Sequence, residues 1–267
     1  RKLISLNENW TLSFPKGERL AEKVTLPHTW NAVDGMDGNG SYLRTTGVYR
    51  CTFLKPEQPL EGGRVYVEVL AAALSAVVKV NGTVATTHEG GFSAFRADIT
   101  DLCKEENNEM TIEVSNEDTP SMYPASADFT FYGGLYRGVN LISVPHTHFD
   151  LDYYGGSGIK VTPKPTEDGG ATFEIESFVT NQEECFTVMY SIEDACGCEV
   201  ASAVRPADDT AVTIYVPDAK LWSMDEPNLY TVVARLQKNN ETYDEIHVNT
   251  GVRSYSVTPD GGFSINN

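Results

Sequence analysis

Positive charge is scarce in this chain of 267 residues, where 20 Lys and Arg stand against 38 Asp and Glu and leave a net charge of −18. Nucleic acids and anionic lipids attract basic surfaces, so this balance argues against both as partners. The acidic residues are dispersed apart from short runs such as Asp101–Glu109, which indicates a solvated surface rather than an acidic tail.

Long apolar runs are also missing. No segment reaches the roughly 20 apolar residues that a membrane-spanning helix needs, so no membrane partner is expected. The first residues, Arg1–Leu6, pass directly into a polar stretch without the apolar core of a signal peptide. We therefore expect a cytoplasmic location, with a periplasmic or secreted one as the alternative.

Cysteine is sparse, with five residues in the whole chain. An odd, scattered set does not form a disulfide framework, and Cys196–Cys198 has neither redox-motif spacing nor a matching zinc pair. We expect five free, buried thiols in a reducing compartment. His146 and His148 form a His-x-His pair without a third ligand at a recognisable spacing. We therefore interpret this pair as part of a linker and predict no metal site.

Helical periodicity is absent from every long stretch. Short β-branched or aromatic runs alternate instead with Gly, Pro, Asn and Asp, which is typical of β-sandwiches. The clearest hairpin is Ala76–Val80 with Thr83–Thr87, because the Asn-Gly pair between them suits a type I′ turn. Two long stretches, Pro27–Thr46 and Thr119–Thr130, are predicted to be irregular loops, which at this length are usually functional or disordered. Further strands are predicted at Arg64–Leu70, Met110–Val114 and Leu135–Val144.

Beyond Pro145 the spacing of strand-like runs becomes nearly regular. Seven runs give the rhythm of an immunoglobulin-like sandwich, without the Cys…Trp…Cys spacing of antibody domains. These runs are Ile159–Thr162, Thr172–Thr180, Phe186–Ile192, Cys198–Val204, Ala211–Val216, Leu229–Leu236 and Tyr243–Val248. We place a domain boundary near His146–Phe149.

The stretch from Ala127 to Asn140 gathers aromatic and basic side chains around the glycine pair Gly133–Gly134, with Asp128 at its head. Glycine permits backbone conformations that a Cβ forbids. A single carboxylate beside aromatics and a glycine turn is how a β-rich module presents an acid to a sugar hydroxyl. The alternative is a capped loop in which Asp128 accepts hydrogen bonds from nearby backbone amides.

The same stretch resembles the loop that closes the sugar-binding domain of family 2 glycoside hydrolases, with Asp128 and Tyr132–Arg137 in the D-x-x-x-Y-G-G-I/L-x-R pattern. Six further motifs resemble that family in the right order: Asn7–Trp10, Leu26–Asn31, Gly47–Arg50, Val80–Gly82, Leu221–Tyr230 and Gly251–Arg253. The resemblance implies an all-β fold. A galactose-binding-like jelly-roll β-sandwich would occupy residues 1–147, and an immunoglobulin-like β-sandwich residues 148–253.

Residues 254–267 resemble the start of the family's catalytic (β/α)₈ barrel, which would carry the two catalytic glutamates of a retaining glycosidase. The Asn-Glu pairs in this chain, such as Asn116–Glu117, lack the family's flanking residues and are typical of solvated turns. The resemblance thus implies no catalytic residue here. We expect this chain alone to hydrolyse no glycoside.

Candidate binding residues also follow from the resemblance. It implies that Asp128 contacts a hydroxyl of the terminal sugar or a bound cation, and Asn31, Tyr42 and Arg44 are weaker candidates for the same rim. Trp30 could stack on a sugar, but we favour a role as an anchor of the core or loop. No cofactor is expected in this chain, whereas the full-length enzyme could hold Na⁺ or Mg²⁺ through oxygen ligands.

Within the family, we expect a retaining exo-glycosidase that hydrolyses terminal β-D-galactosides. Its partners would be a β-galactoside or related oligosaccharide, its own C-terminal barrel and, at full length, further copies in a homo-oligomer. A β-glucuronidase or β-mannosidase is the alternative, although the strong acidity makes an anionic substrate less attractive. A free-standing carbohydrate-binding module is the alternative of another class, and the barrel-like tail Phe263–Asn267 argues against it.

Overall fold

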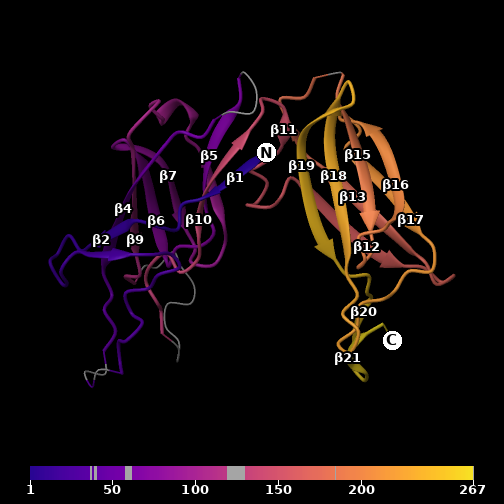
Figure 1. The fold of residues 1–267 in the computed structure, drawn as a ribbon. Coiled ribbons are helices and arrows are strands. Elements are labelled where there is room, and N and C mark those ends of the chain that lie inside the picture. The colour runs from indigo at the N-terminus through magenta and orange to yellow at the C-terminus, as the bar shows by residue number, and fades with distance from the viewer. Residues whose placement is uncertain (37, 39–40, 58–61, 119–129, 184, 267) are drawn as a thin grey trace. The chain divides into compact units, whose positions relative to one another are not determined.

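Two compact units make up the chain. The computed structural model describes residues 1–36, 38, 41–57, 62–118, 130–183 and 185–266. Lys2–Val144 forms the first unit, here called the jelly-roll unit, and Pro145–Asn267 with Arg1 forms the second, here called the immunoglobulin-like unit. Figure 1 shows both as layers of strands, coloured from indigo to yellow along the chain.

The jelly-roll unit consists of a six-stranded and a four-stranded sheet. The larger sheet contains β2 (Trp10–Ser13), β3 (Glu22–Val24), β4 (Thr46–Phe53), β6 (Ser75–Val80), β7 (Thr83–Glu89) and β9 (Asn108–Ser115). The smaller contains β1 (Lys2–Ser5), β5 (Arg64–Val69), β8 (Phe95–Asp98) and β10 (Val139–Val144), and a short 3₁₀ helix η1 (Thr100–Leu102) follows β8. The orders are β3-β2-β4-β9-β6-β7 and β1-β10-β5-β8, with antiparallel pairing throughout.

Strands of the larger sheet bury alternate side chains, whereas β5 and β10 of the smaller sheet are buried at nearly every position. In β6 and β9 every second residue is buried, as a two-residue period demands. The resulting core includes Trp10, Tyr49 and Ile112 from the larger sheet and Val67 and Leu141 from the smaller. The two sheets therefore share one apolar interior, as in a β-sandwich.

The predicted hairpin at the Asn-Gly pair is confirmed. Strands β6 and β7 pair up to Val80 and Thr83, and the two residues between them, Asn81 and Gly82, have φ of 50° and 83°. Positive φ at both central positions is the requirement of a type I′ turn. The turn residues thus set the register of this edge of the sheet.

The immunoglobulin-like unit is a sandwich of three and four strands. One sheet contains β12 (Ile159–Pro165), β13 (Ala171–Ser177) and β17 (Ala211–Val216), and the other contains β15 (Thr187–Glu193), β16 (Glu199–Pro206), β18 (Tyr230–Lys238) and β19 (Glu241–Thr250). Their orders are β12-β13-β17 and β16-β15-β18-β19. Phe173 and Ile214 of the first sheet and Tyr190 and Val232 of the second belong to one core. The predicted all-β fold, a jelly roll followed by an immunoglobulin-like sandwich, is confirmed.

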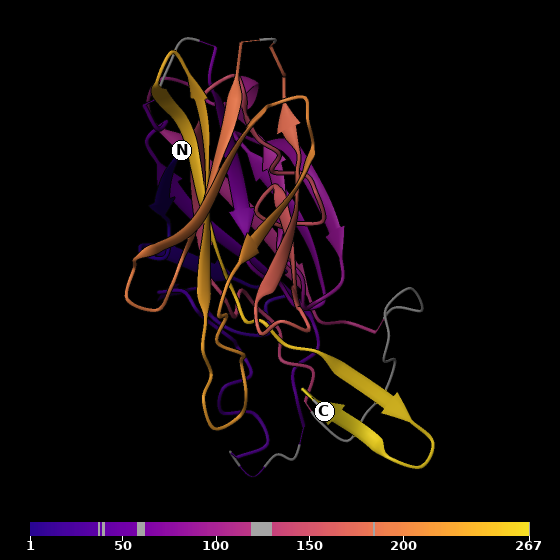
Figure 2. The ribbon, with the colours of Figure 1, turned by 90° about the vertical axis from the view of Figure 1, so that its right-hand side faces the viewer.

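Two small sheets complete this unit. β11 (His148–Phe149) pairs with β14 (Val179–Thr180), and β20 (Tyr255–Thr258) pairs with β21 (Gly262–Ile265). The hairpin of β20 and β21 extends away from the sandwich of its own unit, as the yellow arrows show (Figure 2). Across the described ranges of the chain, no helix is long and apolar enough to span a membrane.

The expectation of five buried thiols is wrong for three of them. Cys51 is buried and Cys103 is partly buried, whereas Cys185, Cys196 and Cys198 are exposed. The exposed three lie in turns that flank β15, where the chain passes over the surface and no opposing sheet covers it.

Candidate functional site

Three segments of the jelly-roll unit lie together in what is here called the loop region: the described residues of 27–45 (27–36, 38 and 41–45) between β3 and β4, residues 116–118 after β9, and residues 130–138 before β10. The backbone nitrogen of His28 donates to the carbonyl of Leu135 at 2.8 Å, which joins the first segment to the last. Nδ2 of Asn116 donates to the carbonyl of Phe131 at 3.0 Å, which joins the second to the last.

The glycine pair allows the last segment to pass close to the first. A Cβ on Gly133 would lie 2.0 Å from Cζ2 of Trp30, and a Cβ on Gly134 would lie 2.6 Å from the carbonyl oxygen of His28. Gly134 also has φ of +127°, a conformation that residues with a side chain rarely adopt. The close approach therefore depends on glycine at both positions, which agrees with the turn predicted from the sequence.

Trp30 anchors the first segment in the core. It is 2% exposed, and its ring meets that of Phe14 edge-to-face with centroids 5.8 Å apart. Its Nε1 donates to the carbonyl of Leu43 at 3.2 Å, so the beginning and the end of the segment are tied through one side chain. Trp30 is thus an anchor, as predicted.

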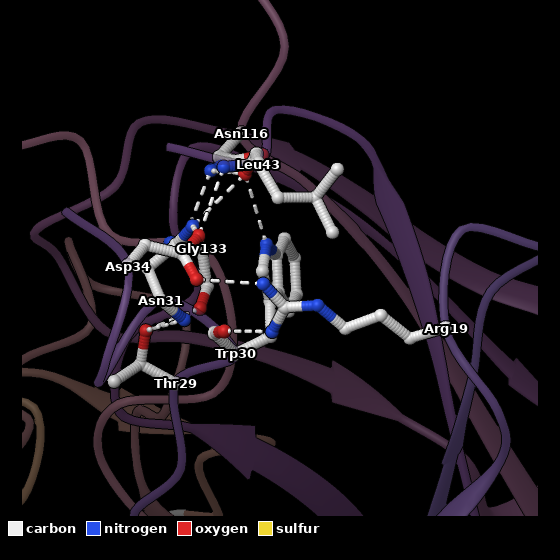
Figure 3. Close-up of polar contacts among 8 residues, drawn as sticks. All are labelled: Arg19, Thr29, Trp30, Asn31, Asp34, Leu43, Asn116 and Gly133. Atoms are coloured by element: carbon white, nitrogen blue, oxygen red, sulfur yellow. Dashed lines mark hydrogen bonds and ion pairs between the residues drawn. The ribbon is translucent and has the colours of Figure 1, made fainter. Parts of the chain in front are cut away.

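Asn31 lies at the centre of a buried polar network (Figure 3). Its Nδ2 donates to Oδ2 of Asp34 at 2.7 Å and to the carbonyl of Leu43 at 3.0 Å. Its Oδ1 accepts from the backbone nitrogen of Gly133 at 2.7 Å and from Nδ2 of Asn116 at 3.3 Å. The two donor hydrogens and two acceptor lone pairs of the amide are therefore all in use.

Asn116 extends this network to all three segments. Besides Asn31, its Nδ2 approaches the carbonyl of Leu43 at 3.1 Å and that of Phe131 at 3.0 Å. Its Oδ1 accepts from the backbone nitrogen of Thr45 at 2.9 Å. Asn116 is fully buried, so its interpretation as part of a solvated turn is wrong: the polar groups around it replace water as partners.

Asp34 brings a negative charge into the network and pairs with Arg19, whose Nη2 lies 2.6 Å from Oδ1. Oδ2 accepts from the backbone nitrogen of Leu43 at 2.9 Å and from Asn31. Burial opposes ionisation, but these donors and the guanidinium outweigh it and hold the pKa of Asp34 below its ordinary value. Asp34 is thus ionised at neutral pH and acts as an acceptor of hydrogen bonds, not as a proton donor.

A second pair lies next to Gly134 and joins the partly buried His28 to the buried Tyr49. Nδ1 of His28 is 2.9 Å from the hydroxyl of Tyr49, and that hydroxyl would be 2.7 Å from a Cβ on Gly134. Burial lowers the pKa of His28 and raises the pKa of Tyr49. Both side chains are therefore neutral at neutral pH and support the glycine turn without adding charge.

Tyr42 and Arg44 lie at the surface of the loop region. The ring of Tyr42 meets that of Tyr132 edge-to-face with centroids 6.5 Å apart. Arg44 forms an ion pair with Asp118, and its guanidinium lies 4.7 Å from the ring centroid of Phe131. Cation and ring at this distance attract one another, so Arg44 is held over the last segment.

The structure therefore brings three of the four predicted binding residues into one region. Asn31 is in its interior, and Tyr42 and Arg44 are at its surface. Asp128 lies outside the described residues, five positions before Gly133 in the sequence. That these four residues contact a sugar stays a prediction.

Three residues of the network were not predicted as site residues: Arg19 and Asp34 were not singled out from the sequence, and Asn116 was assigned to a solvated turn. Asp34 precedes Gly35, which has φ of +77°, so an Asp-Gly pair inside a long loop was an available turn signal. Arg19 comes from the connection between β2 and β3 and has no local signal. Only the folded chain brings it to Asp34.

Two other candidate sites, an open cleft and a buried histidine, lie in the immunoglobulin-like unit. The immunoglobulin-like unit has an open cleft of about 670 Å³, lined by Glu193, Asp194, Asn228 and Thr231 among others. His148 is buried in β11 with Nδ1 2.9 Å from the carbonyl of Pro145, as suits a structural residue. No group of three or more His, Cys, Asp or Glu within the described parts of the chain could hold a metal ion.

Solved structures and curated proteins resemble the whole chain. The crystal structure of an FMN-binding beta-glucuronidase from Facaelibacterium prausnitzii L2-6 is 84% identical with a TM-score of 0.96, over 99% of this chain and 41% of that one. A beta-glucuronidase from Bacteroides fragilis is 29% identical over all of this chain and 40% of its own length. A beta-galactosidase from Bacteroides ovatus is 26% identical over all of this chain and 33% of its own length. The chain thus spans less than half the length of each.

Two family models together match most of the sequence. The model of the sugar binding domain of glycosyl hydrolases family 2 matches residues 3–145. A second model, described as glycosyl hydrolases family 2, matches residues 157–253. These matches follow the two structural units and include the loop region. The chain therefore belongs to glycosyl hydrolases family 2, of which it comprises the sugar-binding domain and the immunoglobulin-like domain that follows.

Proposed function

We propose that this chain is the sugar-binding and immunoglobulin-like part of a β-glucuronidase that hydrolyses terminal β-D-glucuronides. The observation that carries the proposal is the 84% identity, across 99% of this chain, to the FMN-binding beta-glucuronidase from Facaelibacterium prausnitzii L2-6. The Bacteroides fragilis relative, a beta-glucuronidase, supports the same substrate class. This proposal takes the place of the β-galactosidase that the sequence alone favoured.

The chain's own contribution is to bind and position the substrate, not to perform the bond cleavage. Retaining glycosidases need an acid and a nucleophile roughly 5 Å apart. In the described loop region, Asp34 and Asp118 are each paired with an arginine and Glu117 is paired with Lys16, and the pKa of Asp34 is lowered rather than raised. None of these paired carboxylates is suited to protonate a leaving group. The catalytic carboxylates would then belong to the remaining part of the protein, because this chain spans only 40% of the Bacteroides fragilis relative.

The described residues contain no cluster of three potential metal ligands of the His, Cys, Asp or Glu type. That the full-length enzyme holds a Na⁺ or Mg²⁺ ion, with further ligands from the remaining chain, stays a proposal.

A β-galactosidase is the second candidate. The Bacteroides ovatus relative, a beta-galactosidase, matches the whole of this chain at 26% identity. The net charge of −18 also disfavours an anionic substrate through long-range repulsion. The sugars of the two candidates differ at C5, which carries a carboxylate in the glucuronide and a hydroxymethyl group in the galactoside, and in the configuration of the hydroxyl at C4.

Kinetics of the full-length protein test the proposal. We expect kcat/KM for p-nitrophenyl β-D-glucuronide to exceed that for the β-galactoside and the β-mannoside by roughly tenfold to a hundredfold, since a hydrogen bond to a charged group contributes about 1.5–3 kcal/mol. A preference for the galactoside would overturn the glucuronidase in favour of the second candidate.

The 267-residue chain alone provides a second test. We expect no turnover of any of the three glycosides above the buffer background, because the described loop region offers no suitable acid. We also expect no millimolar binding of glucuronate or galactose by calorimetry, since a ligand site normally encloses most of a small ligand. Millimolar or tighter binding would favour an independent carbohydrate-binding module instead.

A further inference from the structure

The surface of the loop region carries two tyrosines from distant parts of the chain. Tyr42 and Tyr132 are 44% and 47% exposed, and their rings meet edge-to-face at an interplanar angle of 77°. Single exposed aromatic residues are common on protein surfaces. Here, however, two rings from segments about ninety residues apart in the sequence are brought into contact and still leave nearly half of their area open.

The position of Tyr42 is fixed by the backbone around it. Its ring lies against Gly35, where a Cβ would be 3.0 Å from the tyrosine hydroxyl and 3.1 Å from Cζ. The next residue, Leu43, donates its backbone N–H to Asp34 at 2.9 Å and accepts from Trp30 and Asn31 through its carbonyl. Tyr42 is therefore held on one side by glycine and on the other by the buried network.

The position of Tyr132 is fixed by the same network. The carbonyl of Phe131 accepts from Asn116 at 3.0 Å, and the backbone nitrogen of Gly133 donates to Asn31 at 2.7 Å. Both neighbours of Tyr132 in the chain are thus bound to buried amides. The two rings are consequently preorganised, so a ligand that contacts them would lose little free energy to ordering the surface.

We propose that Tyr42 and Tyr132 bind the ring of the leaving group of the glycoside, whether phenyl or pyranose, against its apolar face. A tyrosine offers an apolar ring and a polar hydroxyl, which suits ligands that have a flat apolar face and polar edges. The terminal sugar must be enclosed on most sides, whereas in this chain these rings are half exposed, which suits contact with the outer part of a substrate. In a glycoside whose terminal sugar is enclosed, that outer part is the leaving group. The inference rests on the proposed glycosidase function.

Inhibition of the full-length enzyme by non-hydrolysable thioglycosides tests whether Tyr42 and Tyr132, here called the tyrosine platform, bind the leaving group. The probes are phenyl and methyl 1-thio-β-D-glycosides of whichever sugar the wild-type enzyme prefers. We expect Tyr42→Ala and Tyr132→Ala each to raise the inhibition constant of the phenyl compound roughly twofold to tenfold, the range of one aromatic contact, and to leave that of the methyl compound unchanged. Tyr42→Phe and Tyr132→Phe should retain tight binding of the phenyl compound, because they keep the ring.

Tyr154→Ala is the matched control, because Tyr154 is 91% exposed and belongs to the immunoglobulin-like unit. It should leave both inhibition constants unchanged. Equal increases for the phenyl and methyl compounds in the Tyr42 and Tyr132 variants would overturn the platform, as would no increase at all. If the wild-type enzyme prefers another sugar, the glucuronidase proposal is overturned. The proposal for Tyr42 and Tyr132 is still tested, because the inhibition constants of the phenyl and methyl compounds are compared on whichever sugar is preferred.

Discussion

Oδ1 of Asn31 accepts a hydrogen bond of 2.7 Å from the backbone nitrogen of Gly133, although 102 residues separate the two along the chain. The carbonyl of Gly133 accepts in turn from Oγ1 of Thr29 at 2.8 Å. Both backbone polar groups of this glycine are thus held by one short stretch of the long loop. The path of the segment that leads into β10 is therefore set by Asn31 and its neighbours.

Replacing Asn31 by alanine should destabilise the chain. The change leaves the Gly133 N–H and the carboxylate of Asp34 each without one buried partner. Each buried group left without its partner costs about 1–3 kcal/mol, so we expect a loss of about 2–4 kcal/mol in the free energy of unfolding. Guanidinium denaturation of the 267-residue chain measures it. Asn249→Ala, at an exposed position, should change it by less than about 0.5 kcal/mol, and equal effects of the two variants would contradict the role of Asn31.

Gly133→Ala tests the close approach to Trp30. The new Cβ would lie 2.0 Å from the indole ring, so the ring or the segment must move, and overpacking of this kind costs about 1–3 kcal/mol or more. Gly197→Ala is the contrasting variant, since Gly197 has φ of +77° but open space around it. This variant should lower the free energy of unfolding by only about 1 kcal/mol, because alanine disfavours a positive φ. A Gly133→Ala variant as stable as the wild type in thermal unfolding would show that the segment is not confined.

Much of the fold could be predicted because its signals are local. The Asn81–Gly82 turn and the regular strand spacing beyond Pro145 depend on residues that are neighbours in the sequence. The ends of the strands were predicted less accurately. β18 continues to Lys238, two residues beyond the predicted end, because Asn239 and Asn240 both have positive φ and form the tight turn. Asn-Asn is a weaker hairpin signal than Asn-Gly, so the extension was missed.

The candidate site was predicted only in part. Asn31, Tyr42 and Arg44 were assigned to one rim from the family resemblance and their place in one long loop, and the structure brings all three into the loop region. The ion pair of Arg19 and Asp34 could not be predicted, because it depends on a tertiary contact between two connections that share no motif. The burial of Asn31 was equally hidden, since an asparagine in a polar loop has the same local sequence whether it faces water or a buried network.

Stability should depend on the ionisation of Asp34 at low pH. Its pKa lies below the ordinary value of 3.8, because the donors around it outweigh the effect of burial. A lowered pKa means that the unfolded chain binds more protons, so this stabilisation is complete above pH 3.8 and is lost as the pH falls through the folded value. The difference in unfolding free energy between wild type and Asp34→Asn should therefore be largest near neutral pH and shrink below pH 4. A constant difference from pH 7 to pH 3 would contradict this, and Asp225→Asn, at an exposed acid, controls for net charge.

Thiol reactivity should separate the five cysteines into two groups. Cys185, Cys196 and Cys198 are exposed, whereas burial raises the pKa of Cys51 to about 12 and that of Cys103 to about 11. The thiolate is the reactive form, so the buried Cys51 and the partly buried Cys103 should react slowly with Ellman's reagent at pH 8. We expect three fast thiols in the native chain and five after denaturation without reductant. A denatured count of three or one would reveal a disulfide, and five fast native thiols would contradict the burial of Cys51.

The last prediction concerns Asp128, which lies outside the described residues but only five positions before Gly133. In the full-length enzyme, Asp128→Asn should preserve folding and reduce kcat/KM roughly tenfold to a hundredfold, because a sugar hydroxyl loses a charged acceptor worth about 1.5–3 kcal/mol. Melting temperature and kcat/KM are measured on one preparation. Wild-type kinetics with a lowered melting temperature would show instead that Asp128 only caps its loop.

Combining this change with Asn31→Ala shows whether the two residues act through one segment. If Asn31 positions the segment that carries Asp128, its removal misplaces the carboxylate, and the single variant loses part of the same interaction. The double variant should then have a higher kcat/KM than the product of the two single effects predicts, because the interaction cannot be lost twice. Independent sites would instead give multiplied losses. That result would leave Asn31 a stabilising residue of the loop region and remove its link to substrate binding.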